Sequence, residues 1–216
     1  MTSTPTLRPT DALLVIDLQN DFCPPANGVG GALAVTDGHA IVALINTLTP
    51  RFAHTILTQD WHPTRHISFA STHPGTQPYQ TIQAPYGSQT LWPDHCLQHS
   101  PGADLHPNLK IPPNAHTLRK GFRQNIDSYS AFLENDHTTP TGLATYLRDR
   151  NISRLFLCGL AYDFCIRYSA LDGHALGFET IVLEDATRPV NLPNSVAETN
   201  AAFAAAGIPR IQSTTL

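Results

Sequence analysis

The 216-residue sequence contains few charged residues. They make up 14% of the chain, and 13 Lys and Arg against 17 Asp and Glu give a net charge of -4. A typical soluble domain has about 25% charged residues. This composition excludes a strongly basic nucleic-acid-binding protein and an acidic disordered tail. A small-molecule enzyme is still allowed, because it needs no net field.

Long apolar segments are also missing. No stretch approaches the roughly 20 apolar residues that span a bilayer. Residues 1–10 contain no hydrophobic segment typical of a secretory leader. We therefore expect a cytoplasmic protein with neither a membrane nor a nucleic acid as partner. The four cysteines, which show no CxxC spacing, are expected to be reduced thiols: Cys23, Cys96, Cys158 and Cys165.

What the sequence does contain is enough apolar residues for a core. Hydrophobic residues make up 41%, and the length favours one domain over residues 1–216, at roughly 150 residues per domain. Continuous apolar runs alternate with helical periodicity. This predicts an α/β fold with an open, mostly parallel sheet and helices on both faces. Strands are expected at 12–17, 55–58, 117–120, 154–159, 180–183 and 208–211, and helices at 38–48, 141–150, 163–176 and 194–206.

Residues 61–113 differ from the rest of the chain. They are rich in Pro, Gly, His and Gln and show little periodicity, and seven of the 11 histidines lie between positions 54 and 106. A connection this long is usually functional or disordered. Its aromatic residues argue against disorder. We expect a long irregular insertion that covers a site and is not a second domain.

Three reactive side chains lie at or just past predicted strand ends. Asp17 ends the first strand, Lys120 ends the third, and Cys165 follows the fourth, near the start of a helix. Carboxyl ends of parallel strands meet in one crevice. Taken singly, each residue has an ordinary structural explanation, and Cys158 is expected to be core. Together the three suggest a cysteine nucleophile, its pKa lowered by the helix start and the ammonium.

A second group of residues has metal-ligand chemistry. Asp60 and His62 are two positions apart, so on an extended segment both side chains point the same way. A third ligand has to come from elsewhere, and His95 is the candidate. One carboxylate and two imidazoles suit one divalent ion, Zn²⁺, Fe²⁺ or Mn²⁺, with positions left for water or substrate.

Five ordered segments resemble motifs of the isochorismatase-like cysteine hydrolases, and among them of the members that hydrolyse nicotinamide and pyrazinamide. The resemblance runs from about residue 11 to 212. The segments are 17–23 (DLQNDFC), 60–70 (DWHPTRHISFA), 92–98 (WPDHCLQ), 120–132 (beginning KG and containing DSYSAF) and 159–165 (GLAYDFC). The resemblance also indicates that residues 24–31 contain a short insertion relative to that family.

The resemblance implies a reaction and roles for the strand-end residues. Nicotinamide and water would give nicotinate and ammonia through a thioester on Cys165. Asp17 would carry the proton, and Lys120 would stabilise the charged state. The backbone N–H groups of Ala161 and Cys165 would hold the oxyanion, next to a cis peptide between Leu160 and Ala161.

The resemblance also implies how the substrate would be held. A divalent metal on Asp60, His62 and His95 would bind the pyridine nitrogen and waters. Phe22 and Trp92 would flank the ring, with Tyr129 as a further pocket residue, and His66 would orient a ligand of the metal. The expected substrate-binding residues are therefore Phe22, Trp92 and Tyr129, and the expected metal ligands are Asp60, His62 and His95.

Two other hypotheses stay open. One is a different hydrolase on the same scaffold. An isochorismatase needs neither the cysteine nor the metal set, and an N-carbamoyl amidase keeps Asp17, Lys120 and Cys165 without the metal ligands. The other is a metal- or ligand-binding relative without catalysis. The sequence also leaves a homo-oligomer open.

Overall fold

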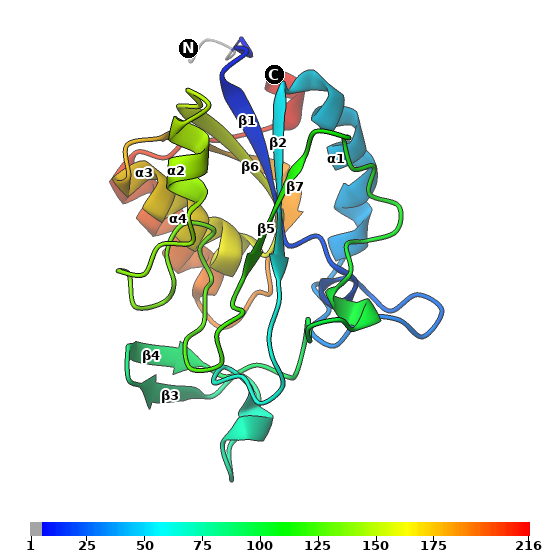
Figure 1. The fold of residues 1–216 in the computed structure, drawn as a ribbon, viewed down its shortest axis with the longest axis vertical. Coiled ribbons are helices and arrows are strands. Elements are labelled where there is room, and N and C mark those ends of the chain that lie inside the picture. Colours follow the sequence, from blue (N-terminus) through cyan, green and yellow to red (C-terminus); the bar gives the residue numbers. More distant parts are fainter. Residues whose placement is uncertain (1–5) are drawn as a thin grey trace.

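A parallel β-sheet forms the centre of the fold (Figure 1). The computed structural model describes residues 6–216; positions 1–5 of the predicted domain lie outside the described residues. Six strands pair in the order β5-β2-β1-β6-β7-β8, and each neighbouring pair is parallel. The predicted open, parallel α/β sheet is confirmed. The strands are β1 (Asp11–Ile16), β2 (His54–Asp60), β5 (His116–Lys120), β6 (Arg154–Leu160), β7 (Glu179–Arg188) and β8 (Arg210–Ile211).

Helices cover both faces of this sheet, and β1 shows why its sequence is continuously apolar. Leu13 and Val15 belong to the core that contains the buried side chains of α1 (Val42–Leu48). Leu14 lies in the core on the other face, with side chains of α2 (Leu143–Arg148), α3 (Arg167–Ala175) and α4 (Ser195–Ala206). Alternate residues of one strand therefore face two different apolar layers.

Strand β6 passes very close to β1 near its carboxyl end. Gly159 has φ +110°, and a Cβ there would lie 2.1 Å from the Ile16 carbonyl oxygen. Only glycine permits both the conformation and the contact. This close approach brings the segment after β6 next to the residue that follows β1.

The helix predicted over 163–176 begins differently. Tyr162–Ile166 forms a π-helical turn, in which the Ile166 N–H donates to the Ala161 carbonyl at 3.1 Å. The α-helical part, α3, starts only at Arg167. Single π-helical turns occur often at functional sites.

None of the helices in residues 6–216 has the length and apolar character needed to cross a bilayer.

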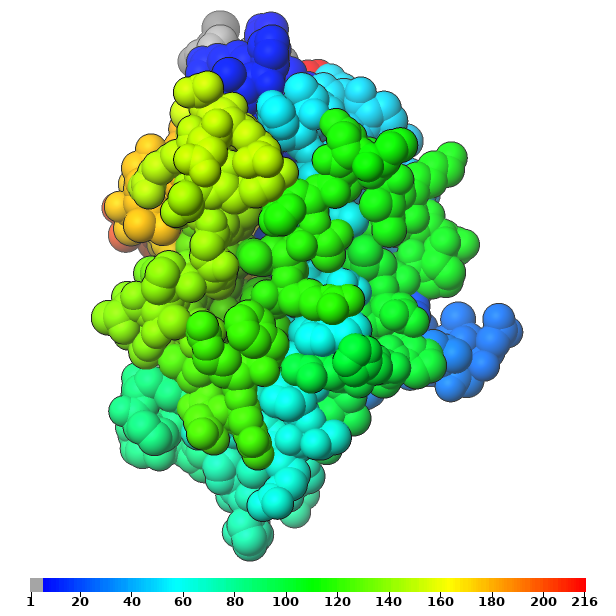
Figure 2. Space-filling view, in the orientation of Figure 1, coloured from blue at the N-terminus to red at the C-terminus, as the bar shows by residue number. Residues whose placement is uncertain are grey.

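The insertion at 61–113 is more regular than predicted. It contains an antiparallel hairpin of β3 (Thr81–Ala84) and β4 (Gly87–Thr90). These strands escaped prediction because they are short and largely polar, and all but one of their residues are partly or fully exposed. Figure 2 shows this teal part of the chain as one end of the molecule, in contact with the rest. The loop at 24–31 projects from the side of the fold (Figure 1).

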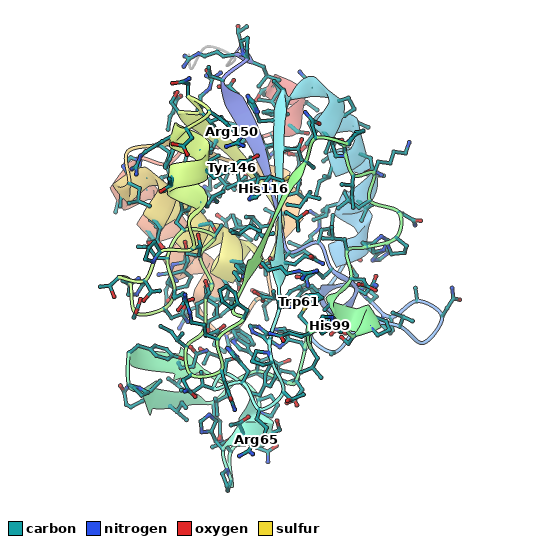
Figure 3. All side chains as sticks on the ribbon, in the orientation of Figure 1. Trp61, Arg65, His99, His116, Tyr146 and Arg150 are labelled. Atoms are coloured by element: carbon teal, nitrogen blue, oxygen red, sulfur yellow. The ribbon has the colours of Figure 1, made fainter. Side chains whose placement is uncertain are left out.

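The edge strand β5 is joined to α2 by stacked side chains. The His116 and Tyr146 rings stack with centroids 3.9 Å apart, and the Arg150 guanidinium lies 3.7 Å from the Tyr146 centroid. Figure 3 shows these three residues close together beside β5. The stack packs α2 next to the strand whose carboxyl end carries Lys120.

Candidate active site

The three predicted strand-end residues meet at Lys120. Its Nζ lies 2.8 Å from Asp17 Oδ2 and 3.4 Å from Cys165 Sγ, and it donates to the Ser128 carbonyl at 2.9 Å. The same Nζ also pairs with Asp60 Oδ1. The Lys120 side chain is fully buried. A buried ammonium requires such partners, and here two carboxylates supply the countercharge.

Asp17 is held by a residue that sequence reasoning missed. Thr58, fully buried in β2, donates its hydroxyl to Asp17 Oδ1 at 2.6 Å and accepts the Asp17 N–H at 3.0 Å. Asp17 itself has φ 44°, so the chain turns sharply after β1. The available sequence signal was a hydroxyl directly after the apolar pair Ile56 and Leu57 of this strand.

The two carboxylates beside Lys120 differ in proton affinity. Burial alone would raise the pKa of Asp60, but Lys120 and His62 lower it well below its usual range. Burial raises the pKa of Asp17; Lys120 opposes this shift and Asp60 adds to it. Burial would lower the pKa of Lys120, but Asp17 and Asp60 raise it well above its usual range. Lys120 is therefore a stable cation, and Asp17 is the more basic carboxylate.

The predicted lowering of the Cys165 pKa is wrong. Burial raises the pKa of this thiol well above its usual value, and Asp17 and Asp60 add to the shift while Lys120 opposes it. The prediction considered only the helix start and one nearby cation. It did not include the free-energy cost of burying a thiolate. Cys165 is therefore a thiol at neutral pH, and its reaction needs a base.

Asp60, His62 and His95 point their ligand atoms at one place. Asp60 Oδ2 lies 3.6 Å from His62 Nε2 and 3.8 Å from His95 Nε2. The Nδ1 atom of His62 lies 2.8 Å from the Gly121 carbonyl, and that of His95 lies 2.8 Å from the Pro93 carbonyl. Each Nδ1–H is therefore engaged by the backbone, which leaves the Nε2 lone pairs for a metal.

These spacings fit a bound divalent ion. Zinc ligands lie about 2.0–2.2 Å from the metal in tetrahedral geometry, which places two ligand atoms about 3.4 Å apart. The three donor atoms are grouped within reach of one ion. Asp60 contacts Lys120 through Oδ1 and faces the histidines through Oδ2. The Asp60 carboxylate thus links the metal-ligand residues to the cluster of Asp17, Lys120 and Cys165.

His66 is adjacent to this group without joining it. Its ring stacks on His62 with centroids 4.2 Å apart. Its nitrogens lie 2.7 Å from Ser68 Oγ and 3.1 Å from the Ile126 carbonyl. Burial lowers the pKa of His66 to about 4. With both nitrogens occupied, the neutral ring supports the orientation of His62.

Gln19 is a second residue that sequence reasoning left without a role. Its Nε2 donates to the Asp60 carbonyl at 2.8 Å and to the Ala103 carbonyl at 2.9 Å, and its Oε1 accepts the Asp60 N–H at 2.8 Å. Gln19 therefore fixes the backbone of a metal-ligand residue. Its place inside the segment 17–23 was the available signal.

A cavity joins the two groups. Cys165 and Ala161 line it together with Asp60, His62 and His95. Its apolar wall contains the predicted Phe22, Trp92 and Tyr129 and also residues that were not predicted: Leu33, Phe164 and Val190. Asp127 also lines the cavity and was not predicted. Such a space suits a small, flat ligand with one polar end at the sulfur.

Aromatic rings that line this cavity pack edge to face. Trp92 and Phe164 meet edge to face, with centroids 4.7 Å apart and an interplanar angle of 86°. Phe22 packs edge to face on His95, with ring centroids 5.4 Å apart.

The predicted cis peptide between Leu160 and Ala161 is present. It precedes the π-helical turn that carries Cys165.

Comparison with known proteins agrees with this geometry. The sequence matches the Isochorismatase domain family over residues 11–213. The chain belongs to the isochorismatase family. It is 46% identical to the nicotinamidase of Acinetobacter baylyi over 202 residues, which cover 94% of this chain and 92% of the relative. It is 44% identical to the Escherichia coli nicotinamidase, with 92% and 93% covered.

Solved structures of the isochorismatase family have the same fold. The Acinetobacter baumanii nicotinamidase/pyrazinamidase superimposes with a TM-score of 0.92 at 47% identity, covering 97% of this chain and 99% of that one. An L. infantum protein in complex with nicotinate gives 0.82 at 38% identity, with 96% and 95% covered. The Pyrococcus horikoshii pyrazinamidase in complex with zinc gives 0.74 at 31%, with 94% and 99% covered.

Proposed function

We propose that this chain hydrolyses nicotinamide to nicotinate and ammonia in a metal-dependent reaction. The observation that carries the proposal is the meeting of Cys165, Lys120 and Asp17 beside Asp60, His62 and His95 at one aromatic-walled cavity. The nicotinamidase relatives and the nicotinate-bound L. infantum structure support the substrate. Pyrazinamide, a similar flat heteroaromatic amide, is the second proposed substrate.

The first half of the reaction transfers the acyl group to sulfur. Asp17 takes the proton of the Cys165 thiol, and the sulfur attacks the amide carbonyl, forming a C–S bond. The N–H groups of Ala161 and Cys165 stabilise the negative oxygen. When the C–N bond breaks, Asp17 gives its proton to the leaving nitrogen, and ammonia departs. The raised pKa of Asp17 suits this proton transfer.

The second half releases the acid. Water attacks the thioester carbonyl, and Asp17 accepts a proton from that water. The C–S bond breaks, Asp17 returns its proton to the sulfur, and the nicotinic acid formed loses its remaining proton to solvent to give nicotinate. Lys120 stays protonated throughout and stabilises each anionic species, because its Nζ is 3.4 Å from the sulfur.

Binding of the ring is assigned to the other end of the cavity. Asp60, His62 and His95 would hold one divalent ion, which supplies a Lewis-acid position for the pyridine nitrogen and so orients the ring. Zinc in the P. horikoshii relative supports such an ion; iron and manganese suit the same donor atoms. Phe22, Trp92 and Tyr129 would enclose the ring.

The cysteines bear on the cellular location. All four are buried and free, which supports the proposal of a reducing, cytoplasmic setting.

Ammonia release from a panel of amides tests the proposal. Nicotinamide and pyrazinamide should release ammonia, and a chelator should stop this until Zn²⁺, Fe²⁺ or Mn²⁺ is added back. Benzamide lacks a ring nitrogen and should react at least about tenfold more slowly, because it loses that directional contact. The absence of ammonia from nicotinamide with metal-replete protein would refute the function. A chelator-insensitive preference for N-carbamoyl substrates would favour the N-carbamoyl amidase alternative.

A further inference from the structure

The β3–β4 hairpin buries one polar side chain. Between Thr81 and Thr90 only Gln89 is buried, and its exposed fraction is 0%; the remaining residues are partly or fully exposed. A two-stranded hairpin has little stability of its own. A buried amide is costly unless its donors and acceptors are satisfied. The contacts of Gln89 therefore decide how this hairpin sits on the protein.

The amide oxygen of Gln89 accepts two hydrogen bonds. Tyr86 donates its hydroxyl to Oε1 at 3.0 Å, and Asn135 donates its Nδ2 at 3.0 Å. Asn135 also accepts the backbone N–H of Tyr129 at 3.0 Å through Oδ1. The oxygen side of Gln89 is thus tied to the loop that carries Tyr129.

The amide nitrogen of Gln89 faces acceptors. Its Nε2 lies 2.7 Å from the Thr90 carbonyl, 3.1 Å from Asp127 Oδ2 and 2.8 Å from Tyr129 Oη. A flipped amide would place its oxygen against a carboxylate and a carbonyl, neither of which can donate. The orientation of Gln89 is therefore unique.

Gln89 contacts two cavity residues, Asp127 and Tyr129, and is connected to a third, Trp92, through the Tyr129 hydroxyl. Trp92 donates its Nε1–H to the Tyr129 hydroxyl at 3.1 Å, so that oxygen is contacted by both Gln89 and Trp92. Trp92, Tyr129 and Asp127 line the cavity, and Gln89 does not. The hairpin thereby fixes one wall of the cavity through one side chain.

We propose that Gln89 is a positioning residue for substrate binding: it holds Trp92, Tyr129 and Asp127 as the wall against which a flat aromatic amide packs. This inference rests on the proposed function. Gln89 does not contact Cys165, Lys120 or Asp17, so its loss acts on the fit of the ring and leaves the acyl-transfer step alone.

The test compares Gln89→Met with Gln83→Met. Both variants replace glutamine by an apolar side chain of similar length in the same hairpin, but Gln83 is exposed. Gln89→Met should raise KM for nicotinamide and weaken nicotinate binding, each at least about tenfold, because Tyr129 and Asp127 lose a buried partner. Its kcat should stay within about threefold, as expected when ground-state and transition-state binding are lost equally. Gln83→Met should match the wild type, and bound metal should be equal in all three proteins.

A double-mutant cycle keeps the test decisive. In a Tyr129→Phe background, Gln89→Met should raise KM by only about twofold, because the shared hydroxyl is already gone and only the contact with Asp127 is still lost. If Gln89→Met does not fold, Asn135→Ala removes one Gln89 partner from a half-buried position and should raise KM by about two- to fivefold.

An unchanged KM in Gln89→Met, or a fall in kcat with KM unchanged, would overturn the inference. So would a full Gln89→Met effect in the Tyr129→Phe background. Failure of the proposed function would look different, because the wild type itself would then release no ammonia from nicotinamide.

Discussion

The strand-end cluster and the insertion build their parts of the site in different ways. Asp17, Lys120 and Asp60 lie at or just past the carboxyl ends of neighbouring parallel strands, and Asp60 pairs directly with Lys120 in the β2–β5 register. His62 and His95 belong to the insertion. There, isolated β-bridges hold the segments: the His62 N–H donates to the Cys96 carbonyl at 3.0 Å, and the Gln98 N–H donates to the His62 carbonyl at 2.8 Å.

This difference suggests a division of labour. The sheet fixes the groups that would make and break bonds, because paired strands allow little displacement. The insertion supplies groups that would bind and orient a substrate, as loops on a rigid scaffold usually do. Changes in the strand-end cluster should therefore act on kcat, and changes in the insertion should act on KM. Asp60 belongs to both parts.

The largest effect is expected for Lys120→Met. It leaves Asp17 and Asp60 buried without their common cation, which should lower the free energy of unfolding by about 3–5 kcal/mol at pH 7. Turnover should fall by about 1,000-fold with the loss of this charge-stabilising donor. The stability deficit should shrink as the pH falls, because protonation removes the unpaired negative charge.

Lys110→Met is the matched control, since Lys110 is exposed. It should retain wild-type turnover and denaturant midpoint. A Lys120→Met protein as stable and as active as this control would remove Lys120 from the centre of the cluster.

A smaller and different effect is expected for His95→Ala. Metal affinity should fall by at least about 100-fold, because a direct ligand is lost and even outer partners contribute 10–100-fold. KM for nicotinamide should rise by more than kcat falls. Metal content by atomic emission and steady-state kinetics check this. His99→Ala is the control, because His99 is exposed and its ring packs edge to face on the Trp61 ring, with centroids 5.3 Å apart (Figure 3). Unchanged metal content in His95→Ala would exclude it as a ligand.

The smallest effect is expected for Thr58→Val, which removes the hydrogen bond to the Asp17 carboxylate together with the acceptor of the Asp17 N–H. The kcat should fall by about fivefold, in line with about 1 kcal/mol for one hydrogen bond, with KM unchanged. Asp17 acts as a base, so kcat/KM should decline as the pH falls through its pKa, which burial raises above 3.8. The Thr58 hydrogen bond lowers this pKa. Its loss should therefore move the decline to higher pH.

Thr55→Val, a similar change at a buried position earlier in β2, controls for the strand itself. It should keep the wild-type pH profile. Identical acid limbs in Thr58→Val and the wild type would argue against Asp17 as the base.

The sheet was predictable because burial on both faces leaves a direct trace in the sequence. Continuous apolar runs such as that of β1 require two covering layers. The hairpin β3–β4 left no such trace, because its strands are short and largely polar, and all but one of their residues are partly or fully exposed. It is held by the buried Gln89, whose partners outside the hairpin are Asp127, Tyr129 and Asn135.

The site was predictable to a similar degree. Strand ends and the motif segments pointed to residues that the structure brings together at one cavity. Thr58, Gln19 and Gln89 were missed because a buried polar side chain is recognisable only once its partners are known. The Cys165 pKa was misjudged for a related reason, since burial outweighs its local neighbours.

The central claim, that Cys165 is the nucleophile, is tested most directly by trapping its acyl form. Metal-replete protein mixed with nicotinamide and quenched in acid within one turnover should carry one nicotinoyl group, and peptide mass spectrometry should place it on Cys165. Cys165→Ala, folded and with normal metal content, should carry none and release no ammonia. Turnover by Cys165→Ala, or a nicotinoyl group on another residue, would contradict the account.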